Sequence, residues 1–181
     1  MKILNTKLPE IKIIIPKIFN DERGYFFESY QENKFKEKGI PFYFPQDNQV
    51  FSKKNVIRGL HYQLIKPQGK LVRAIHGEIL DVAVDIRKGS PNFGNYISVR
   101  LSEKNKKMLY VPEGFAHGYS VLSEECVVSY KCTNIYDLNY EYGIVWNDPD
   151  IDISWGIENP VISSKDLQLP YLNKQNKLPK F

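Results

Sequence analysis

The chain contains 181 residues, of which 42% are hydrophobic and 25% charged, a composition that indicates a folded globular protein and excludes a disordered one. The net charge of +4 is too small and too evenly distributed to indicate nucleic-acid binding. Apolar runs are only a few residues long, as at residues 13–15, so no segment is expected to cross a membrane. The N-terminal sequence lacks the features of a secretory signal, and we therefore expect a cytoplasmic protein.

The first forty residues predict two strands and a helix. Residues 10–19 and 24–30 are rich in Ile, Phe and Tyr and predict strands, with a turn at residues 20–24 between them. Residues 31–39 predict a short helix that ends at Gly39. The length fits one domain, and we expect residues 1–181 to fold as a single unit.

Between residues 56 and 133 short strands alternate with Gly, Pro and Asn residues. The clearest strand, at 78–87, has one aliphatic face and one face that carries two carboxylates, Asp81 and Asp85. A half-polar strand is typical of a barrel or sandwich whose interior holds a polar site. Further strands are predicted at 70–76, 94–101, 107–112, 117–123 and 125–133. The predicted fold class is therefore all-β, a sandwich or jelly roll.

The C-terminal third, residues 134–181, predicts an irregular segment with one helical turn near residues 163–167. Cys126 and Cys132 lie six residues apart in one predicted strand, too far apart to bond, so we expect reduced core cysteines. The sequence contains no zinc-binding framework, no His-x-His pair and no GxGxxG segment.

Two of the three histidines lie in unusual local settings. His61 is part of RGLHYQ and His117 is part of PEGFAHG, whereas His76 has no such context. Tyr130 and several basic side chains also lie near predicted strands. This inventory suits proton abstraction next to a carbonyl group: a His takes the proton, a Lys stabilises the enolate oxygen and a Tyr returns a proton from the other side.

Such a base needs a carboxylate that holds the imidazole in one tautomer. Asp81, Asp85 and Asp166 are the candidates, and their spacing in the sequence does not distinguish among them.

Several long segments, in this order and spacing, resemble the nucleotide-sugar 3,5-epimerase family: RGLHYQ, QGKLVRAIHGEILDVAVDIRKGSPNFG, VPEGFAHGYSVLS, YKCT and GIVWNDPDI. The resemblance extends from about residue 10 to residue 170. It implies a cupin-type jelly roll with short peripheral helices, and a homodimer in which N-terminal strands join the sheet of the partner.

The resemblance also implies an activity. Family members invert C3 and C5, or C3 alone, of a nucleoside-diphosphate-linked 4-keto sugar by acid–base proton transfer through an enolate, without a cofactor or metal. The first expected substrate is dTDP-4-dehydro-6-deoxyglucose, converted to dTDP-4-dehydrorhamnose. The same chemistry on a GDP-linked 4-keto-6-deoxy-heptose or -hexose for surface polysaccharide stays open. A metal-dependent cupin and a non-catalytic cupin are more distant alternatives.

By motif, the resemblance implies four catalytic residues. His61 is implied as the general base and Asp166 as the carboxylate that orients it. Lys70 is implied as the cation that faces the C4 oxygen, and Tyr130 as the general acid on the opposite face.

Six further residues are implied to bind the substrate. Arg58 and His117 are expected at the sugar–diphosphate part of the site. The nucleotide group is expected to contact Gln46, Asn48, Arg23 and Glu28, the last two from the neighbouring subunit.

The chain departs from the family pattern after YKCT. Members commonly carry an acidic residue and two aromatics there, whereas this chain has Asn134, Ile135 and Tyr136. An aromatic that would line the sugar pocket is thus replaced by Ile135, unless Tyr136 fills its place. The identity of the sugar and the number of inverted centres depend on this difference.

Overall fold

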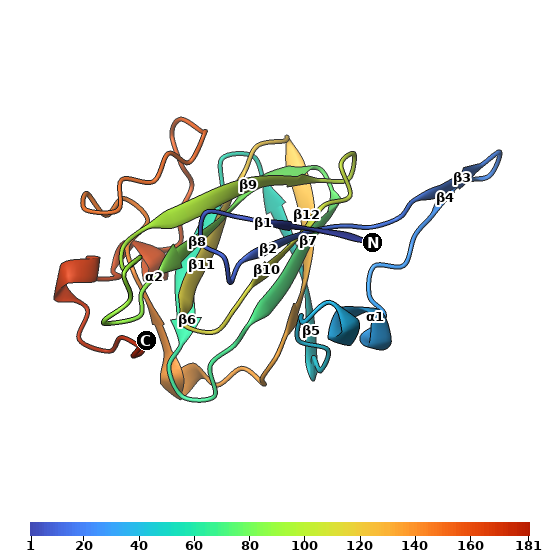
Figure 1. The fold of residues 1–181 in the computed structure, drawn as a ribbon. Helices are drawn as coiled ribbons and strands as arrows, with labels where there is room; N and C mark the ends of the chain where they lie inside the picture. The colour runs from blue at the N-terminus through green and yellow to red at the C-terminus, as the bar shows by residue number, and fades with distance from the viewer.

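Two antiparallel sheets lie face to face in the computed structural model, which describes residues 1–181 (Figure 1). The order in the six-stranded sheet is β1 (Lys2–Asn5), β2 (Lys12–Ile15), β10 (Met108–Val111), β7 (Lys70–His76), β12 (Glu125–Cys132) and β5 (Gln46–Lys53). The order in the five-stranded sheet is β13 (Glu141–Gly143), β6 (Ile57–Gln63), β11 (Phe115–Val121), β8 (Glu78–Asp85) and β9 (Tyr96–Ser102). The all-β jelly roll predicted from the sequence is confirmed.

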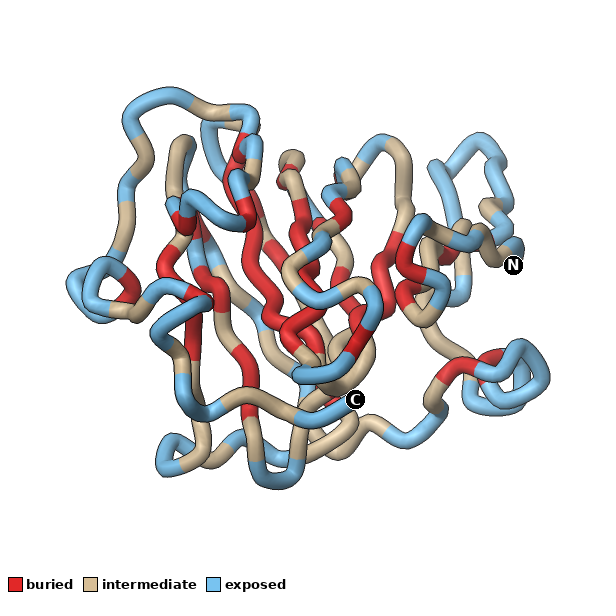
Figure 2. The backbone as a smooth tube through the Cα atoms, turned by 60° about the vertical axis from the view of Figure 1, so that its left-hand side comes forward, coloured by how far each residue is buried: buried red, intermediate tan, exposed pale blue.

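The main apolar core fills the space between the two sheets. It contains 15 buried residues, among them Val72 and Val128 from one sheet and Ile79 and Phe115 from the other. Figure 2 shows the buried residues along the central strands and the exposed residues in the connecting loops. Cys126 and Cys132 are buried and free, as expected for reduced core cysteines.

Both faces of β8 are buried, for different reasons. Ile79 and Ala83 point into the core between the sheets. Val82 and Val84 point outward and pack in a second cluster with Trp155 of the C-terminal segment, which covers this sheet. The C-terminal segment therefore shields from solvent the outer face of the five-stranded sheet, a face that is often exposed in antiparallel sheets.

The short helix α1 (Glu32–Glu37) covers the outer face of the six-stranded sheet. Phe35 is fully buried there against Ile14, Leu71 and Met108. The prediction of a helix in this region is confirmed. After the C-cap residue Lys38, Gly39 has a φ of +67°, a conformation that glycine adopts without strain.

The strand predicted at 10–19 is present but shorter, because β2 begins at Lys12 and ends at Ile15, immediately before Pro16. Residues 19–26 form a separate hairpin from β3 (Phe19–Asp21) and β4 (Gly24–Phe26), and residues 27–30 form no strand. This N-terminal hairpin projects away from the two sheets (Figure 1).

The remaining predicted strands are present, with ends shifted by no more than two residues. Strands β1, β5, β6 and β13 had no predicted strand of their own, although β6 lies in the region where short strands were expected. The C-terminal third is largely irregular, as expected, and contains α2 (Ser164–Leu167) where the helical turn was predicted. Neither helix has the length or apolar character needed to cross a membrane.

A buried ion pair fixes the chain at the end of β8. The Asp85 carboxylate accepts hydrogen bonds from Arg87 Nη2 at 2.6 Å and from Ser90 Oγ at 2.6 Å. Arg87 also reaches Glu10 Oε1 at 2.9 Å. Burial raises the pKa of the Asp85 carboxyl, but the hydrogen bonds from Arg87 and Ser90 outweigh burial and hold it below the ordinary value.

We predict that Asp85→Ala lowers the free energy of unfolding by about 3–5 kcal/mol, because it leaves the buried guanidinium of Arg87 without its main partner. Urea unfolding at pH 7 measures this loss. The control is Asp21→Ala, which removes an exposed pair with Arg23 and is expected to leave stability nearly unchanged. Equal stability of the two variants would contradict the structural role of Asp85.

Candidate active site

Two cavities between the sheets meet at three of the predicted catalytic residues, His61, Lys70 and Tyr130. The first cavity has a volume of about 470 Å³, and the predicted residues Arg58, His117 and Asp166 also line it. The second has a volume of about 290 Å³, and the predicted residues Gln46 and Asn48 also line it. Eight of the ten predicted site residues therefore lie in one connected region.

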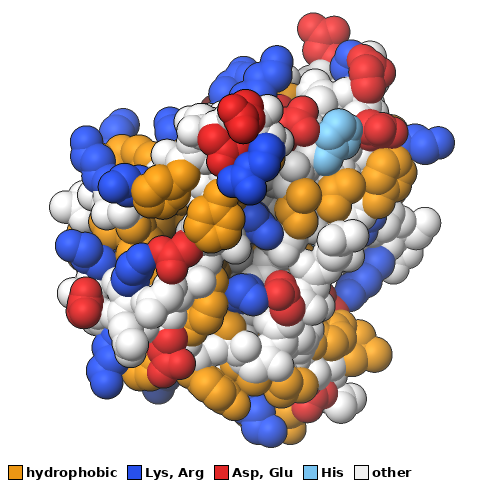
Figure 3. Space-filling view, turned by 90° about the vertical axis from the view of Figure 1, so that its right-hand side faces the viewer, with side chains coloured by type: hydrophobic (Ala, Val, Ile, Leu, Met, Phe, Trp, Pro, Cys, Tyr) orange, Lys and Arg blue, Asp and Glu red, His pale blue; other side chains and the backbone are white.

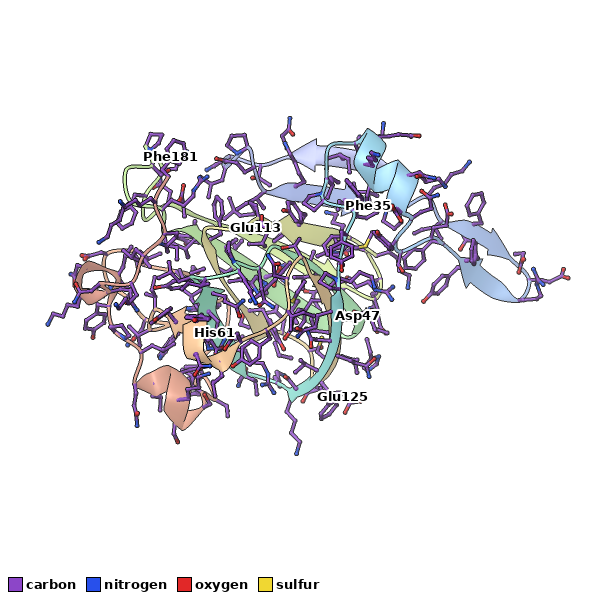
Figure 4. All side chains as sticks on the ribbon, turned by 90° about the horizontal axis from the view of Figure 1, so that it is seen from below. Phe35, Asp47, His61, Glu113, Glu125 and Phe181 are labelled. Atoms are coloured by element: carbon purple, nitrogen blue, oxygen red, sulfur yellow. The ribbon has the colours of Figure 1, made fainter.

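Opposite walls of this region come from opposite sheets. His61 of β6 and His117 of β11 are cross-strand neighbours in the five-stranded sheet. Lys70 of β7 lies opposite Cys132 in the six-stranded sheet, and Tyr130 is two residues from Cys132 on the same face of β12. The two histidines thus face a lysine and a tyrosine across the cavity (Figure 4 labels His61).

Asp166 is the carboxylate that holds His61. Ser163 caps α2 by accepting a hydrogen bond from the Asp166 amide at 3.1 Å, which fixes the direction of the Asp166 side chain. Asp166 Oδ1 lies 2.8 Å from His61 Nε2, and Oδ2 accepts the Gly59 amide hydrogen bond at 3.2 Å. Of the three carboxylates that the sequence offered, geometry selects this one.

The pair is arranged to make His61 a base. Burial raises the pKa of the Asp166 carboxyl, but the hydrogen bond and charge of His61 outweigh burial and hold the pKa below its ordinary value. The carboxyl is therefore ionised at neutral pH. An ionised carboxylate can only accept, so neutral His61 carries its hydrogen on Nε2. The lone pair is then on Nδ1, which can take a proton.

A second His–carboxylate pair lies beside the first. His117 Nε2 is 2.8 Å from Asp81 Oδ1, and both side chains are almost completely buried. The sequence predicted His117 as a binding residue but did not predict its partner. The third candidate carboxylate, Asp85, points away from the cavities toward Arg87.

Lys70 and Tyr130 are both affected by burial, in the direction expected for each group. Burial lowers the pKa of the Lys70 ammonium, and the nearby Cys132, Glu141 and Asp81 oppose this effect. Burial raises the pKa of the Tyr130 hydroxyl, so the phenol keeps its proton at neutral pH and can donate it.

Two glycines allow β6 and β11 to approach closely next to the histidines. Gly59 has a φ of +117°, and a Cβ atom there would lie 2.6 Å from the Gly118 Cα. A Cβ atom on Gly118 would lie 2.6 Å from the Arg58 carbonyl oxygen. The glycines in RGLHYQ and PEGFAHG are therefore required by a backbone contact.

Polar side chains of the unpredicted strand β5 line the second cavity. Gln46 Nε2 donates to Asn48 Oδ1 at 3.1 Å, and Gln46 Oε1 accepts the Tyr136 amide hydrogen bond at 2.7 Å. In the first cavity, Arg58 Nε donates to Ser52 Oγ at 3.0 Å.

Sequence reasoning missed Glu141 and Lys165, which also line the site. Glu141 accepts hydrogen bonds from the Tyr136 hydroxyl, at 2.8 Å, and from Lys165. Burial raises the pKa of the Glu141 carboxyl, but these two donors bring it below the ordinary value. Glu141 belongs to the three-residue strand β13, and a strand of that length has no periodic signal. Ile135 is exposed and lies outside both cavities, whereas the aromatic ring of Tyr136 lines the second cavity.

Arg23 and Glu28 are not part of the site formed by their own chain. The Arg23 side chain is 85% exposed and pairs with Asp21, and Glu28 pairs with Lys34. The N-terminal hairpin that carries Arg23 extends away from the sheets that hold His61 (Figure 4). No group of three or more His, Cys, Asp or Glu side chains is arranged to hold a metal ion, and His76 lies at the surface beside Glu103.

Comparison with known proteins supplies independent evidence. Residues 5–174 match the family model described as dTDP-4-dehydrorhamnose 3,5-epimerase. The dTDP-4-dehydrorhamnose 3,5-epimerase of Methanothermobacter thermautotrophicus is 51% identical over 168 residues, which are 91% of each chain. That of Salmonella typhimurium is 50% identical over 177 residues, 96% of this chain and 97% of the other.

Solved structures agree with these relatives. The dTDP-6-deoxy-D-glucose-3,5-epimerase of Legionella pneumophila, in complex with dTDP-4-keto-L-rhamnose, has a TM-score of 0.97 and 47% identity over 99% of this chain and 98% of that one. The 3'-monoepimerase ChmJ of Streptomyces bikiniensis, in complex with dTDP-quinovose, has a TM-score of 0.91 and 28% identity over 97% of this chain and 92% of that one.

The Asp166–His61 pair predicts a pH-dependent contribution to stability. Because folding lowers the pKa of Asp166 below its ordinary 3.8, the ionised carboxylate stabilises the fold above that pH and loses this effect as the pH falls through the lowered value. We expect Asp166→Asn to cost about 2 kcal/mol near neutral pH. Urea unfolding between pH 2 and pH 7 should show the difference from wild type closing below about pH 4; a difference that is constant with pH would contradict the assignment.

Proposed function

The chain belongs to the dTDP-4-dehydrorhamnose 3,5-epimerase family, and we propose that it inverts C3 and C5 of dTDP-4-dehydro-6-deoxyglucose to give dTDP-4-dehydrorhamnose. The family match covers most of the chain, and two relatives that are 51% identical to it are named dTDP-4-dehydrorhamnose 3,5-epimerase. The protein is thus an isomerase that acts on a dTDP-linked 4-keto sugar.

The observation that carries the mechanism is the position of the acid and the base on opposite walls. The His61–Asp166 pair belongs to the side of the five-stranded sheet, and Tyr130 and Lys70 belong to the six-stranded sheet. Inversion of a carbon centre requires that one face loses a proton and the other face gains one. A sugar ring held between the two sheets meets this requirement without turning over.

Each inversion proceeds in two proton transfers. The C4 carbonyl acidifies the hydrogens on C3 and C5, and His61 Nδ1 removes one of them. The C–H electron pair forms a C=C bond to C4, and the π electrons of the carbonyl move to the C4 oxygen. The resulting enolate oxygen carries the negative charge next to the Lys70 ammonium. Tyr130 then gives its hydroxyl proton to the opposite face of the same carbon, and exchange with solvent returns His61 and Tyr130 to their starting states.

The remaining cavity residues fit a nucleoside diphosphate. Arg58 offers a planar set of donors suited to phosphate oxygens, and His117 lies beside it on the cavity wall. The amides of Gln46 and Asn48 and the ring of Tyr136 offer hydrogen bonds and a stacking surface for a base. We assign these residues to substrate binding.

The activity is tested by incubating the protein with dTDP-4-dehydro-6-deoxyglucose in deuterated water and counting deuterons at C3 and C5. We expect both centres to exchange and invert in the wild type. His61→Asn should lower exchange by about two to four orders of magnitude, because the base is removed. Tyr130→Phe keeps the ring and should retain part of the exchange while inversion falls.

Three results would contradict the proposal. Turnover of His61→Asn above a tenth of wild type, with the fold intact, would remove His61 as the base. Deuterium at C3 alone would identify a monoepimerase, and exchange only in a GDP-linked 4-keto sugar would assign the other nucleotide. His76→Asn is the matched control, since His76 lies at the surface outside both cavities.

We also assign a homodimer in which the N-terminal hairpin completes the partner's site. The hairpin exposes Phe19, Tyr25 and Phe26, each at least half exposed, on an arm that projects from the body of the chain. Figure 3 views the molecule from the side of this arm, where hydrophobic side chains are interspersed with charged ones. An exposed apolar arm is stabilised when a second copy covers it, and the Arg23 at its tip is then available to a nucleotide in the neighbouring cavity.

Mixed dimers test the shared site. Arg23→Ala and His61→Asn homodimers should each lose most activity, whereas mixing the two should restore one working site per mixed dimer, since that site has both residues intact. Arg100→Ala, another exposed arginine, is the control and should keep wild-type activity. Sedimentation of a monomer at micromolar concentration, or no recovery despite demonstrated subunit exchange, would overturn the dimer assignment.

A further inference from the structure

Gln63, the last residue of RGLHYQ, is almost completely buried in the wall of the second cavity, and no step of the proposed mechanism uses it. Its side-chain amide is joined to the backbone of two loops. Nε2 donates to the carbonyl oxygens of Lys66, at 2.6 Å, and Ile135, at 3.1 Å, while Oε1 accepts the Asp137 amide hydrogen bond at 2.8 Å. Both donors of the amide are therefore used within the protein, and Gln63 has none left for a ligand.

The bonds to Ile135 and Asp137 lie on either side of Tyr136, whose ring lines the same cavity. These three residues belong to no helix or strand, so no sheet ladder fixes their backbone. Side-chain amides take that part: Gln63 holds the two outer residues, and Gln46 Oε1 accepts the Tyr136 amide hydrogen bond at 2.7 Å. The Tyr136 ring is thus held in the cavity through its own backbone.

Burial distinguishes Gln63 from the loop that it holds. Ile135 is 56% exposed and Tyr136 is 43% exposed, whereas Gln63 is 5% exposed. Exposed segments without sheet partners are ordinarily mobile, because few contacts oppose their conformational entropy. Gln63 belongs to β6, which has a neighbouring strand on each side, so it gives the loop a fixed point in the five-stranded sheet.

The same strand carries the general base. His61 and Gln63 are two residues apart on β6, point to the same face and both line the second cavity. Two residues of a strand span about 7 Å, so β6 sets the distance between the general base and the point that holds the loop. The Tyr136 hydroxyl donates to Glu141 at 2.8 Å, and Glu141 is the partner of Gln63 in the register of β13 with β6. The ring is therefore fixed relative to His61 at both of its ends.

We propose that Gln63 is a positioning residue for the nucleobase: by holding residues 135–137, it keeps the Tyr136 ring in place as a preformed wall of the second cavity. The inference rests on the proposed function, in which this cavity takes the nucleobase of a dTDP-linked sugar. Without Gln63 the loop has to be ordered when the nucleotide binds, and that ordering reduces the affinity. The amide makes no hydrogen bond to a catalytic side chain, so the proton transfers should keep their rate.

The test uses Gln63→Met, which preserves the length of the side chain and removes its hydrogen bonds. Calorimetric titration should show the Kd for dTDP rising about tenfold, because binding now includes the ordering of the loop. The affinity for inorganic pyrophosphate, which has no nucleobase, should stay at the wild-type value. In the epimerase assay KM should rise by a larger factor than kcat falls, the pattern of lost binding that substrate and transition state share.

The matched control is Gln175→Met, which makes the same change outside both cavities. Gln175 Nε2 donates to the Gly143 carbonyl oxygen at 3.0 Å, and Oε1 accepts the Lys177 amide hydrogen bond at 3.0 Å. This variant loses a similar set of bonds and should keep the wild-type affinity for dTDP. Gln63→Ser, in which water can fill the vacated space, replaces Gln63→Met if that variant does not fold, with the same expected loss of dTDP affinity.

A double-mutant cycle separates positioning from a general loss of structure. Tyr136→Ala removes the ring, so the affinity for dTDP should fall. If Gln63 acts through that ring, Gln63→Met should not raise the Kd further in the Tyr136→Ala background. Additive losses would overturn the role of Gln63, because they would show that it acts on dTDP independently of Tyr136.

A measurement without a ligand separates this inference from the proposed function. Hydrogen exchange followed by mass spectrometry reports the protection of the peptide that contains residues 135–137. Exchange should be faster in Gln63→Met, whose Asp137 amide has lost its acceptor, and unchanged in Gln175→Met. Wild-type protection and wild-type dTDP affinity in folded Gln63→Met would overturn the positioning role. A wild-type protein that binds dTDP no more tightly than pyrophosphate would instead overturn the proposed nucleotide, whatever the exchange shows.

Discussion

The hydrogen bond between His61 and Asp166 joins parts of the chain that are more than a hundred residues apart, and the site depends on it. Asp166 belongs to the C-terminal segment that covers the outer face of the five-stranded sheet. Its second oxygen takes the amide of Gly59, and Gly59 is packed against Gly118 beside His117. The same contact therefore sets the tautomer of the base, attaches the covering segment and holds the two strands that carry the histidines.

The space between the sheets serves two purposes that conflict energetically. Most inward positions are apolar and build the core, but a smaller set is charged and lines the cavities. Placing the partly exposed Lys70 and the buried Asp81 and His117 between the sheets costs stability unless each side chain finds a partner. Asp81 and His117 pair with each other, whereas Lys70 depends on the field of its neighbours, as expected for a group whose counter-charge is supplied by the reaction.

The parts of the fold that the sequence predicts are those with a hydrophobic period. Strand β8 was recognised because its apolar positions alternate with the polar ones. Strand β5 was missed because its inward positions begin with Gln46 and Asn48, which face the second cavity, so the alternation is polar on both faces. The choice of Asp166 over Asp81 and Asp85 follows from the family resemblance and not from spacing, since a contact between distant segments leaves no local pattern. The hydrogen bond now provides its physical basis.

The two-sheet architecture itself accounts for the stereochemistry. Packed sheets lie about 10 Å apart, a spacing that admits one sugar ring between side chains that extend from both walls. If the base and the acid were on neighbouring strands of one sheet, both would approach the same face of the ring, and the proton would return to the side it left. With His61 on β6 and Tyr130 on β12, the proposed mechanism removes the proton from one face and returns it to the opposite face. In the proposed mechanism, inversion in place of simple exchange therefore follows from which sheet supplies the base and which supplies the acid.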